Sequence, residues 1–113
     1  MKKAQEEVAE FWGVTPTSVM LIEEMGELTQ AVVKYLRIIH KGKLVPTKNS
    51  KKAITDNIAE EIADVRICLD ELEYLLNLEE DVEEWRKKKR EREDCRARSE
   101  KRKRGNKTKL VRK

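Results

Sequence analysis

Two short acidic motifs contain the residues of this chain that are best suited to chemistry. With an offset of 37 residues, the segment 21–28 (LIEEMGEL) matches the segment 58–65 (IAEEIADV) in residue type at every position. Each motif has two carboxylates three residues apart, a spacing that puts both side chains on one helical face. The pairs are Glu24 with Glu27 and Glu61 with Asp64. If the two helices pack side by side, the four carboxylates form a cluster beside the core.

No basic residue close in sequence neutralises these carboxylates. Residues 20–33 contain three acids and no base, and residues 53–65 contain four acids and no base. Converging like charges destabilise a fold unless a cation joins them. Because oxygen ligands favour hard divalent ions, the motifs predict a site for magnesium, manganese or calcium rather than zinc. The competing interpretation is a solvated acidic face, which explains a single pair better than two pairs in matching register.

Two long helices are expected to position these motifs. Apolar residues recur along each in alternating steps of four and three, a period typical of a helix that packs against a partner. The first row is Leu21, Met25, Leu28, Val32, Tyr35 and Ile39, and the second row is Ile58, Ile62, Val65, Leu69, Leu72 and Leu76. The carboxylate pairs flank these rows, so they are expected at the rim of the core.

Capping residues predict where the helices begin and end. Thr15, which precedes a proline, is expected to cap the first long helix, and Gly42 is expected to end it. Residues 43–55 then form a connector whose last residue, Thr55, caps the second long helix. A shorter helix over residues 2–11 is expected to precede them.

Charge divides the chain into two parts of opposite sign. Residues 1–85 contain 10 basic and 18 acidic residues, a net charge of −8, whereas residues 86–113 contain 16 and 4, a net charge of +12. We therefore expect a helical domain over residues 1–92 and a basic, disordered tail over residues 93–113. Such a tail could contact nucleic-acid phosphates or simply keep the chain in solution.

The composition favours one fold class. A chain of 113 residues that is 42% charged and 38% hydrophobic can bury one modest core, and its four glycines and two prolines argue against an all-β fold. We expect an all-α, antiparallel helical bundle whose four-helix core is completed in a homodimer or homotetramer. The apolar stretches are too short to span a membrane, and the sequence predicts no export signal, so a cytoplasmic location is expected.

The acidic motifs also resemble the signature of a known family. The segments 23–28 (EEMGEL) and 60–65 (EEIADV) are similar to the paired elements of the MazG-like, all-α nucleoside triphosphate pyrophosphohydrolases. The resemblance extends over residues 17 to about 90 and is strongest to short, phage-type members. It implies Mg2+, or Mn2+, as cofactor, with four ligands: Glu24, Glu27, Glu61 and Asp64. It also implies hydrolysis between the α- and β-phosphates, which yields a monophosphate and pyrophosphate. One feature departs from the family's pattern. The segment from Leu28 to Glu60, which separates the two elements, has 33 residues and is longer than expected.

Other residues are candidates for the remaining roles in such a reaction. A spare carboxylate, Glu23 or Glu60, could take a proton from the attacking water. Lys34 continues the face of the first carboxylate pair and could contact the phosphates, although a solvated lysine is an equal alternative. Trp12 could stack on a base, with a place in the core or in a subunit interface as its alternative.

Two other functions fit the same sequence. Phosphoribosyl-ATP pyrophosphohydrolase is an enzyme with a similar helical arrangement of carboxylates. A non-enzymatic helical adaptor whose basic tail binds nucleic acid belongs to a different class.

Overall fold

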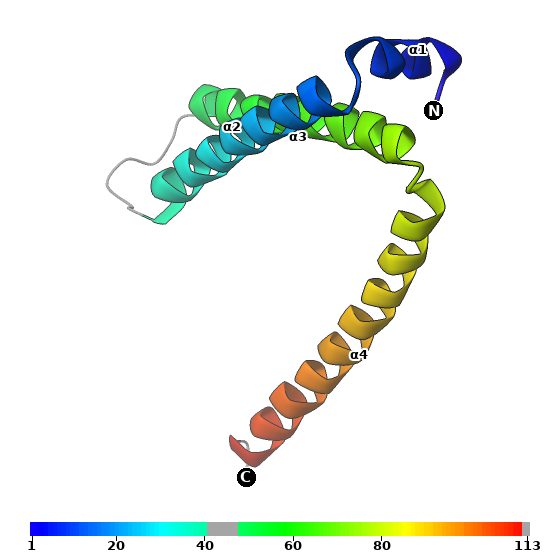
Figure 1. The fold of residues 1–113 in the computed structure, drawn as a ribbon. Coiled ribbons are helices and arrows are strands. Elements are labelled where there is room, and N and C mark those ends of the chain that lie inside the picture. Colours follow the sequence, from blue (N-terminus) through cyan, green and yellow to red (C-terminus); the bar gives the residue numbers. More distant parts are fainter. Residues whose placement is uncertain (41–47, 112–113) are drawn as a thin grey trace. The chain divides into compact units, whose positions relative to one another are not determined.

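The structure, a computed structural model, consists of four helices in the part of the chain that it describes. Its backbone is described over residues 1–40 and 48–111, and its side chains over residues 1–39 and 51–105. The helices are α1 (Lys3–Trp12), α2 (Val14–His40), α3 (Lys48–Leu76) and α4 (Glu79–Val111) (Figure 1). The predicted all-α class is confirmed, and none of the described helices is both long enough and apolar enough to cross a membrane.

The chain divides into two compact units, Met1–Asn77 and Leu78–Lys113. Asn77 follows the last residue of α3 with a φ of 57°, and its N–H donates to the carbonyl of Tyr74. Asparagine tolerates this left-handed conformation better than most residues, so it ends α3 where a helix would otherwise continue. The sequence-based boundary after residue 92 was drawn from charge and remains a prediction.

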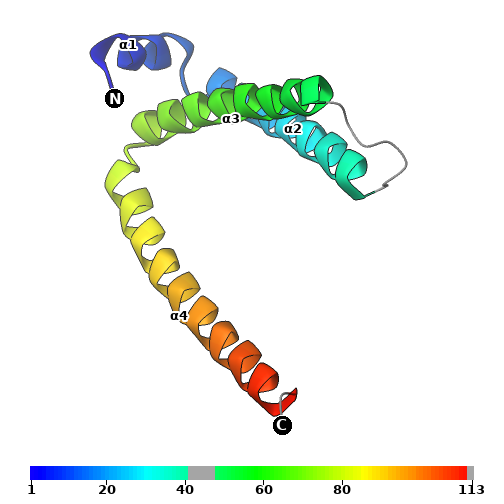
Figure 2. The same ribbon diagram turned by 180° about the vertical axis from the view of Figure 1, so that it is seen from behind.

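The first unit is an α2–α3 hairpin with α1 packed on it. Helices α2 and α3 lie side by side and run in opposite directions (Figures 1 and 2). Gly13, at a φ of 80°, ends α1 and donates its N–H to the carbonyl of Ala9, as expected for a glycine after a helix. The Tyr74 hydroxyl donates to the Glu10 carboxylate, which ties α1 to α3.

The face that α2 turns toward α3 differs from the predicted apolar row. Met25 is 51% exposed, and Val32 and Ile39 are also exposed. The buried or half-buried side chains of α2 are Thr17, Ser18, Leu21, Glu24, Leu28, Ala31, Tyr35 and Ile38. The helix is rotated so that Glu24, Ala31 and Ile38 take inner positions in place of Met25, Val32 and Ile39.

Helix α3 shows the same rotation. Leu69 and Leu76, both predicted to be in the apolar row, are exposed. Cys68, which is 3% exposed, takes an inner position instead and forms the core with Leu21 and Val65. Leu28 and Leu72 pack against this core, as the sequence predicts for both.

Two of the predicted helix starts are wrong. Helix α3 begins at Lys48, so Thr55 lies inside it, and its hydroxyl donates to the carbonyls of Lys51 and Lys52 at 3.0 Å each. A threonine inside a helix can bond in this way to carbonyls of the preceding turn, so Thr55 does not act as a cap. Helix α2 begins at Val14, one residue before the predicted cap Thr15.

The C-terminal ends of α2 and α4 were also predicted from the sequence. Helix α2 ends at His40, and the predicted terminator Gly42 lies outside the described residues. Helix α4 continues to Val111, beyond Glu93, where the sequence predicts a change to a disordered tail. Ion pairs one turn apart favour the helical state, among them Lys88 with Glu84 at 3.2 Å and Arg104 with Glu100 at 3.8 Å.

Candidate metal centre

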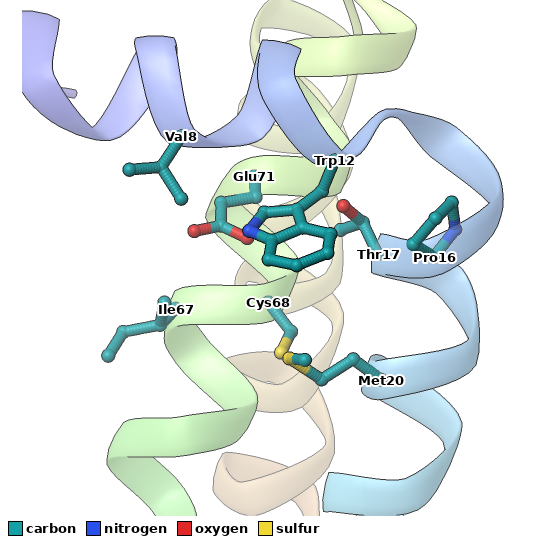
Figure 3. Close-up of a pocket in the computed structure, with 8 residues that line it drawn as sticks. All are labelled: Val8, Trp12, Pro16, Thr17, Met20, Ile67, Cys68 and Glu71. Carbon is teal, nitrogen blue, oxygen red and sulfur yellow. The ribbon is translucent and has the colours of Figure 1, made fainter.

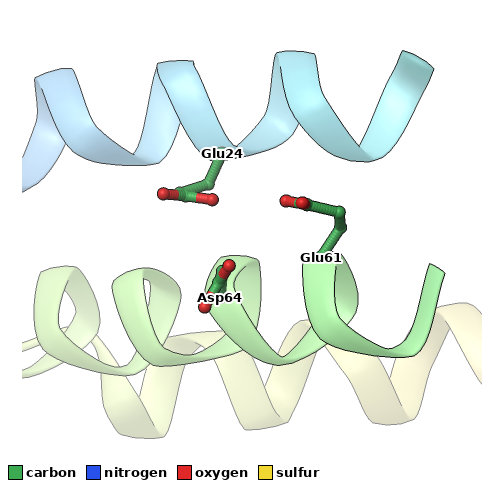
Figure 4. A group of neighbouring side chains, drawn as sticks. All are labelled: Glu24, Glu61 and Asp64. Atoms are coloured by element: carbon green, nitrogen blue, oxygen red, sulfur yellow. The ribbon is translucent and has the colours of Figure 1, made fainter. Parts of the chain in front are cut away.

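Three carboxylates meet between α2 and α3. Glu24 comes from α2, and Glu61 and Asp64 come from α3. One carboxylate oxygen from each residue lies within 4.8 Å of the other two. Figure 4 shows the side chains directed into the space between the two helices. Three of the four carboxylates implied by the family resemblance are therefore brought together.

The helix positions of these residues explain their convergence. Glu24 lies between Leu21 and Leu28 on the inner face of α2, and Glu61 lies one turn before Val65 on α3. Leu21 and Val65 belong to the same core, so packing of the apolar side chains holds the carboxylates next to each other. All three acidic side chains are half-buried.

This arrangement raises the pKa of two of the three carboxyl groups. Burial, followed by the negative charges of Glu27 and Asp64, raises the pKa of Glu24 to about 7. Burial and the charge of Glu27 also raise the pKa of Glu61. Both groups therefore bind protons more readily than an isolated glutamate, as expected when like charges share a confined space.

Two oxygen atoms of the cluster are buried without compensation. Glu24 Oε2 and Glu61 Oε2 have no hydrogen-bond partner among the described residues. A buried acceptor without a partner costs free energy, and more so when it is charged. A divalent cation would satisfy both oxygens and remove the repulsion, and an all-oxygen set of ligands suits magnesium or manganese.

Glu27, the fourth predicted ligand, stands at the edge of this cluster. Its side chain is exposed, and it does not belong to the group of oxygens within 4.8 Å. Its charge nevertheless raises the pKa of Glu24 and of Glu61. It is therefore close enough to affect any ion held by the other three.

The other predicted site residues lie outside the cluster. Glu23 and Glu60, the candidate bases, are exposed, although the charge of Glu60 contributes to the raised pKa of Glu61. Lys34 is also exposed on α2. Trp12 is 55% exposed, so the alternative of a tryptophan buried in the core is not what the structure shows.

Next to the cluster, residues of α1, α2 and α3 line a partly open pocket of about 200 Å³. Figure 3 shows its lining, which consists of Val8, Trp12, Pro16, Thr17, Met20, Ile67, Cys68 and Glu71. Burial, followed by the charges of Glu71 and Glu24, raises the pKa of the Cys68 thiol, so the thiol is a neutral part of the wall. The pocket is mainly apolar with a few polar atoms, as in many small-molecule sites.

Thr17 and Glu71 are functional candidates that the sequence interpretation missed. Both are buried, although polar residues of these types are usually exposed. The helical period offered a signal for Glu71, because it follows Asp64 by two turns and Cys68 by one turn on the same face of α3. Thr17 was overlooked because its neighbourhood was interpreted only as a helix start.

Comparisons of the chain with known protein families, characterised proteins and solved structures find no match.

Proposed function

We propose that the protein is a magnesium-dependent nucleoside triphosphate pyrophosphohydrolase that cleaves between the α- and β-phosphates. The observation that supports it best is the group of three half-buried carboxylates within 4.8 Å, two of which have a buried oxygen without a partner among the described residues. The resemblance of the two acidic motifs to MazG-like enzymes supports the choice of reaction.

Glu24, Glu61 and Asp64 would hold the ion, with Glu27 at its side. When bound, magnesium would neutralise phosphate charge and acidify a coordinated water. The carboxylates alone would repel a triphosphate, so their role in this proposal is to bind the ion in the space between the helices. Glu23 or Glu60 would accept the proton of the attacking water from the exposed side of the cluster, and Lys34 would contact the phosphates.

Pyrophosphate release from a panel of ribo- and deoxynucleoside triphosphates tests this proposal. We expect turnover that requires magnesium and falls at least roughly a hundredfold in Glu61→Gln and in Asp64→Asn, because each variant removes a ligand. Asp70→Asn is the matched control, since Asp70 is an exposed carboxylate on the same helix.

A second measurement separates binding from turnover. Magnesium should raise the Tm of the wild type and of the Asp70→Asn variant but not of Glu61→Gln, because a ligand that binds only the folded state stabilises it. If no nucleotide is hydrolysed and magnesium leaves the Tm unchanged, the acidic cluster is structural and the proposal fails. A direct comparison with phosphoribosyl-ATP distinguishes the related pyrophosphohydrolase.

The exposed basic helix favours a second candidate function, nucleic-acid binding by α4. Every described side chain of α4 from residue 83 to residue 105 is exposed, and the segment 86–104 contains 12 basic and four acidic residues. Such a density of positive charge attracts phosphates without reading the sequence of bases. Truncation after Arg92 should abolish binding to duplex DNA or RNA, and binding should weaken steeply as salt rises. Unchanged affinity after truncation would exclude this role.

Exposed apolar side chains support the proposal of a homodimer or homotetramer. On α2 they form a second apolar row, Ile22, Met25, Val32 and Leu36, which is separate from the face toward α3. A four-helix core formed by two such hairpins would cover this row.

A further inference from the structure

The pocket between α1, α2 and α3 contains two buried polar groups that the proposed chemistry does not use. Thr17 is 3% exposed and Glu71 is 9% exposed, and both line the pocket. The Thr17 hydroxyl oxygen has no hydrogen-bond partner among the described residues. Buried polar groups are usually satisfied, so an unpartnered hydroxyl in a pocket wall points to a ligand that supplies the missing bond.

The size and lining of the pocket limit the kind of ligand. A volume of about 200 Å³ is below the roughly 300–1,000 Å³ typical of sites for drug-sized molecules, so it suits one ring system rather than a whole nucleotide. Its walls are mainly apolar, with the indole of Trp12 on one side. In Figure 3 the Glu71 carboxylate and the Thr17 hydroxyl lie at opposite edges of the Trp12 indole. A flat heterocycle with a polar edge matches this lining.

The position of the pocket links it to the acidic cluster. Cys68 and Glu71 follow Asp64 by four and seven residues along α3, which places them about 6 and 10 Å further along the helix axis. A sugar and one phosphate can bridge such a distance. A nucleotide with its phosphates at the cluster would therefore bring its base to this pocket.

We propose that the pocket receives the base of the nucleoside triphosphate, and that Glu71 and Thr17 select bases with an amino group. This inference rests on the proposed function. The Glu71 carboxylate accepts a hydrogen bond from the amino group, while the Thr17 hydroxyl donates to the adjacent ring nitrogen. Uracil and thymine present a carbonyl oxygen where cytosine presents its amino group, and two facing acceptors repel each other.

The paired substrates dCTP and dUTP test the selection, because their bases differ at only two adjacent atoms. Cytosine has an amino group where uracil has a carbonyl oxygen, and the ring nitrogen beside it carries a proton only in uracil. At pH 8 we expect kcat/KM for dCTP to exceed that for dUTP by roughly tenfold or more, the value of one hydrogen bond to a charged group. Glu71→Gln should bring this ratio close to one, because its amide can donate as well as accept. Thr17→Val should lower kcat/KM for dCTP, and Asp70→Asn should leave the ratio unchanged.

Binding of deoxycytidine, which has no phosphate, provides a readout that is independent of catalysis. Titration calorimetry without metal should detect binding to the wild type and weaker binding to the Glu71→Gln variant. An unchanged dCTP to dUTP ratio in correctly folded Glu71→Gln protein would overturn the inference. If no triphosphate is hydrolysed at all, the proposed function fails, and deoxycytidine then decides the pocket: no binding overturns its assignment, and binding that depends on Glu71 upholds it.

Discussion

At the scale of single residues, Glu24 shows how the fold holds an acidic group in an unfavourable place. It occupies a position on the inner face of α2 where an apolar residue would pack well, and it faces Glu61 and Asp64 from α3. Burial, followed by the charges of Glu27, Asp64 and Glu61, raises the pKa of Glu24 to about 7. Without a cation, the ionised form of Glu24 is therefore destabilised in the folded protein, and the proposed metal ion would offset this repulsion.

The raised pKa of Glu24 predicts how stability depends on pH without metal. The folded-state pKa of about 7 lies above the value of 4.5 for a free glutamate side chain, so between these pH values Glu24 binds more protons in the folded state than in the unfolded state. The contribution of Glu24 to the free energy of unfolding therefore decreases as pH rises from about 4.5 to 7. Urea denaturation in the presence of a metal chelator checks this. The free energy of unfolding of the wild type, relative to that of Glu24→Gln, should decrease over this pH range.

Magnesium provides the control for this prediction. Above pH 7 the ion should restore stability to the wild type and have a much smaller effect on Glu24→Gln, which retains only part of the cluster. A stability difference that stays constant from pH 5 to 8 would mean that Glu24 ionises in the folded protein as it does in the unfolded chain.

At the scale of helices, the sequence predicted the elements better than their faces. The periodic apolar residues correctly indicated two long helices, and the repeated acidic motifs correctly indicated that Glu24, Glu61 and Asp64 would converge. The predicted rows nevertheless turned Met25 and Leu69 inward, whereas in the structure the half-buried Glu24 and the buried Cys68 take those inner positions. Both helices have apolar residues on more than one face, so the period alone does not decide which face contacts the partner.

Ala31 shows how closely α2 and α3 pack, which the apolar period does not reveal. It is 2% exposed at this contact, so a larger side chain has no space there. Ala31→Leu should reduce the free energy of unfolding by about 1–3 kcal/mol through overpacking. Ala59→Leu on α3 is the matched control, because Ala59 is exposed and the same change should cost little. Equal effects of the two substitutions in urea denaturation would place α2 and α3 further apart than in this structure.

At the scale of the whole molecule, the chain combines an acidic first unit with a basic helix. Charge led the sequence analysis to a boundary after residue 92, which remains a prediction, whereas the packing boundary at Asn77 depends on a backbone conformation that composition does not encode. Pairing of Thr17 and Glu71 in one pocket was equally beyond prediction, because it requires α1, α2 and α3 to meet. Charge patterns are thus visible in sequence, while sites formed between helices require the packing.

The second apolar row on α2 gives a prediction about assembly. Ile22 is 70% exposed and Met25 is 51% exposed, so a lone hairpin leaves apolar surface in water that a second copy could cover. Sedimentation equilibrium should find a dimer or tetramer for the wild type, and Ile22→Lys should shift it to a monomer because burial of the new charge is costly. Gln30→Lys is the control, since Gln30 is exposed on α2 outside the row. A monomeric wild type would leave the row without a partner copy and would contradict the proposed four-helix core. If Ile22→Lys and Gln30→Lys dissociate the assembly equally, the effect comes from the added charge and not from this row.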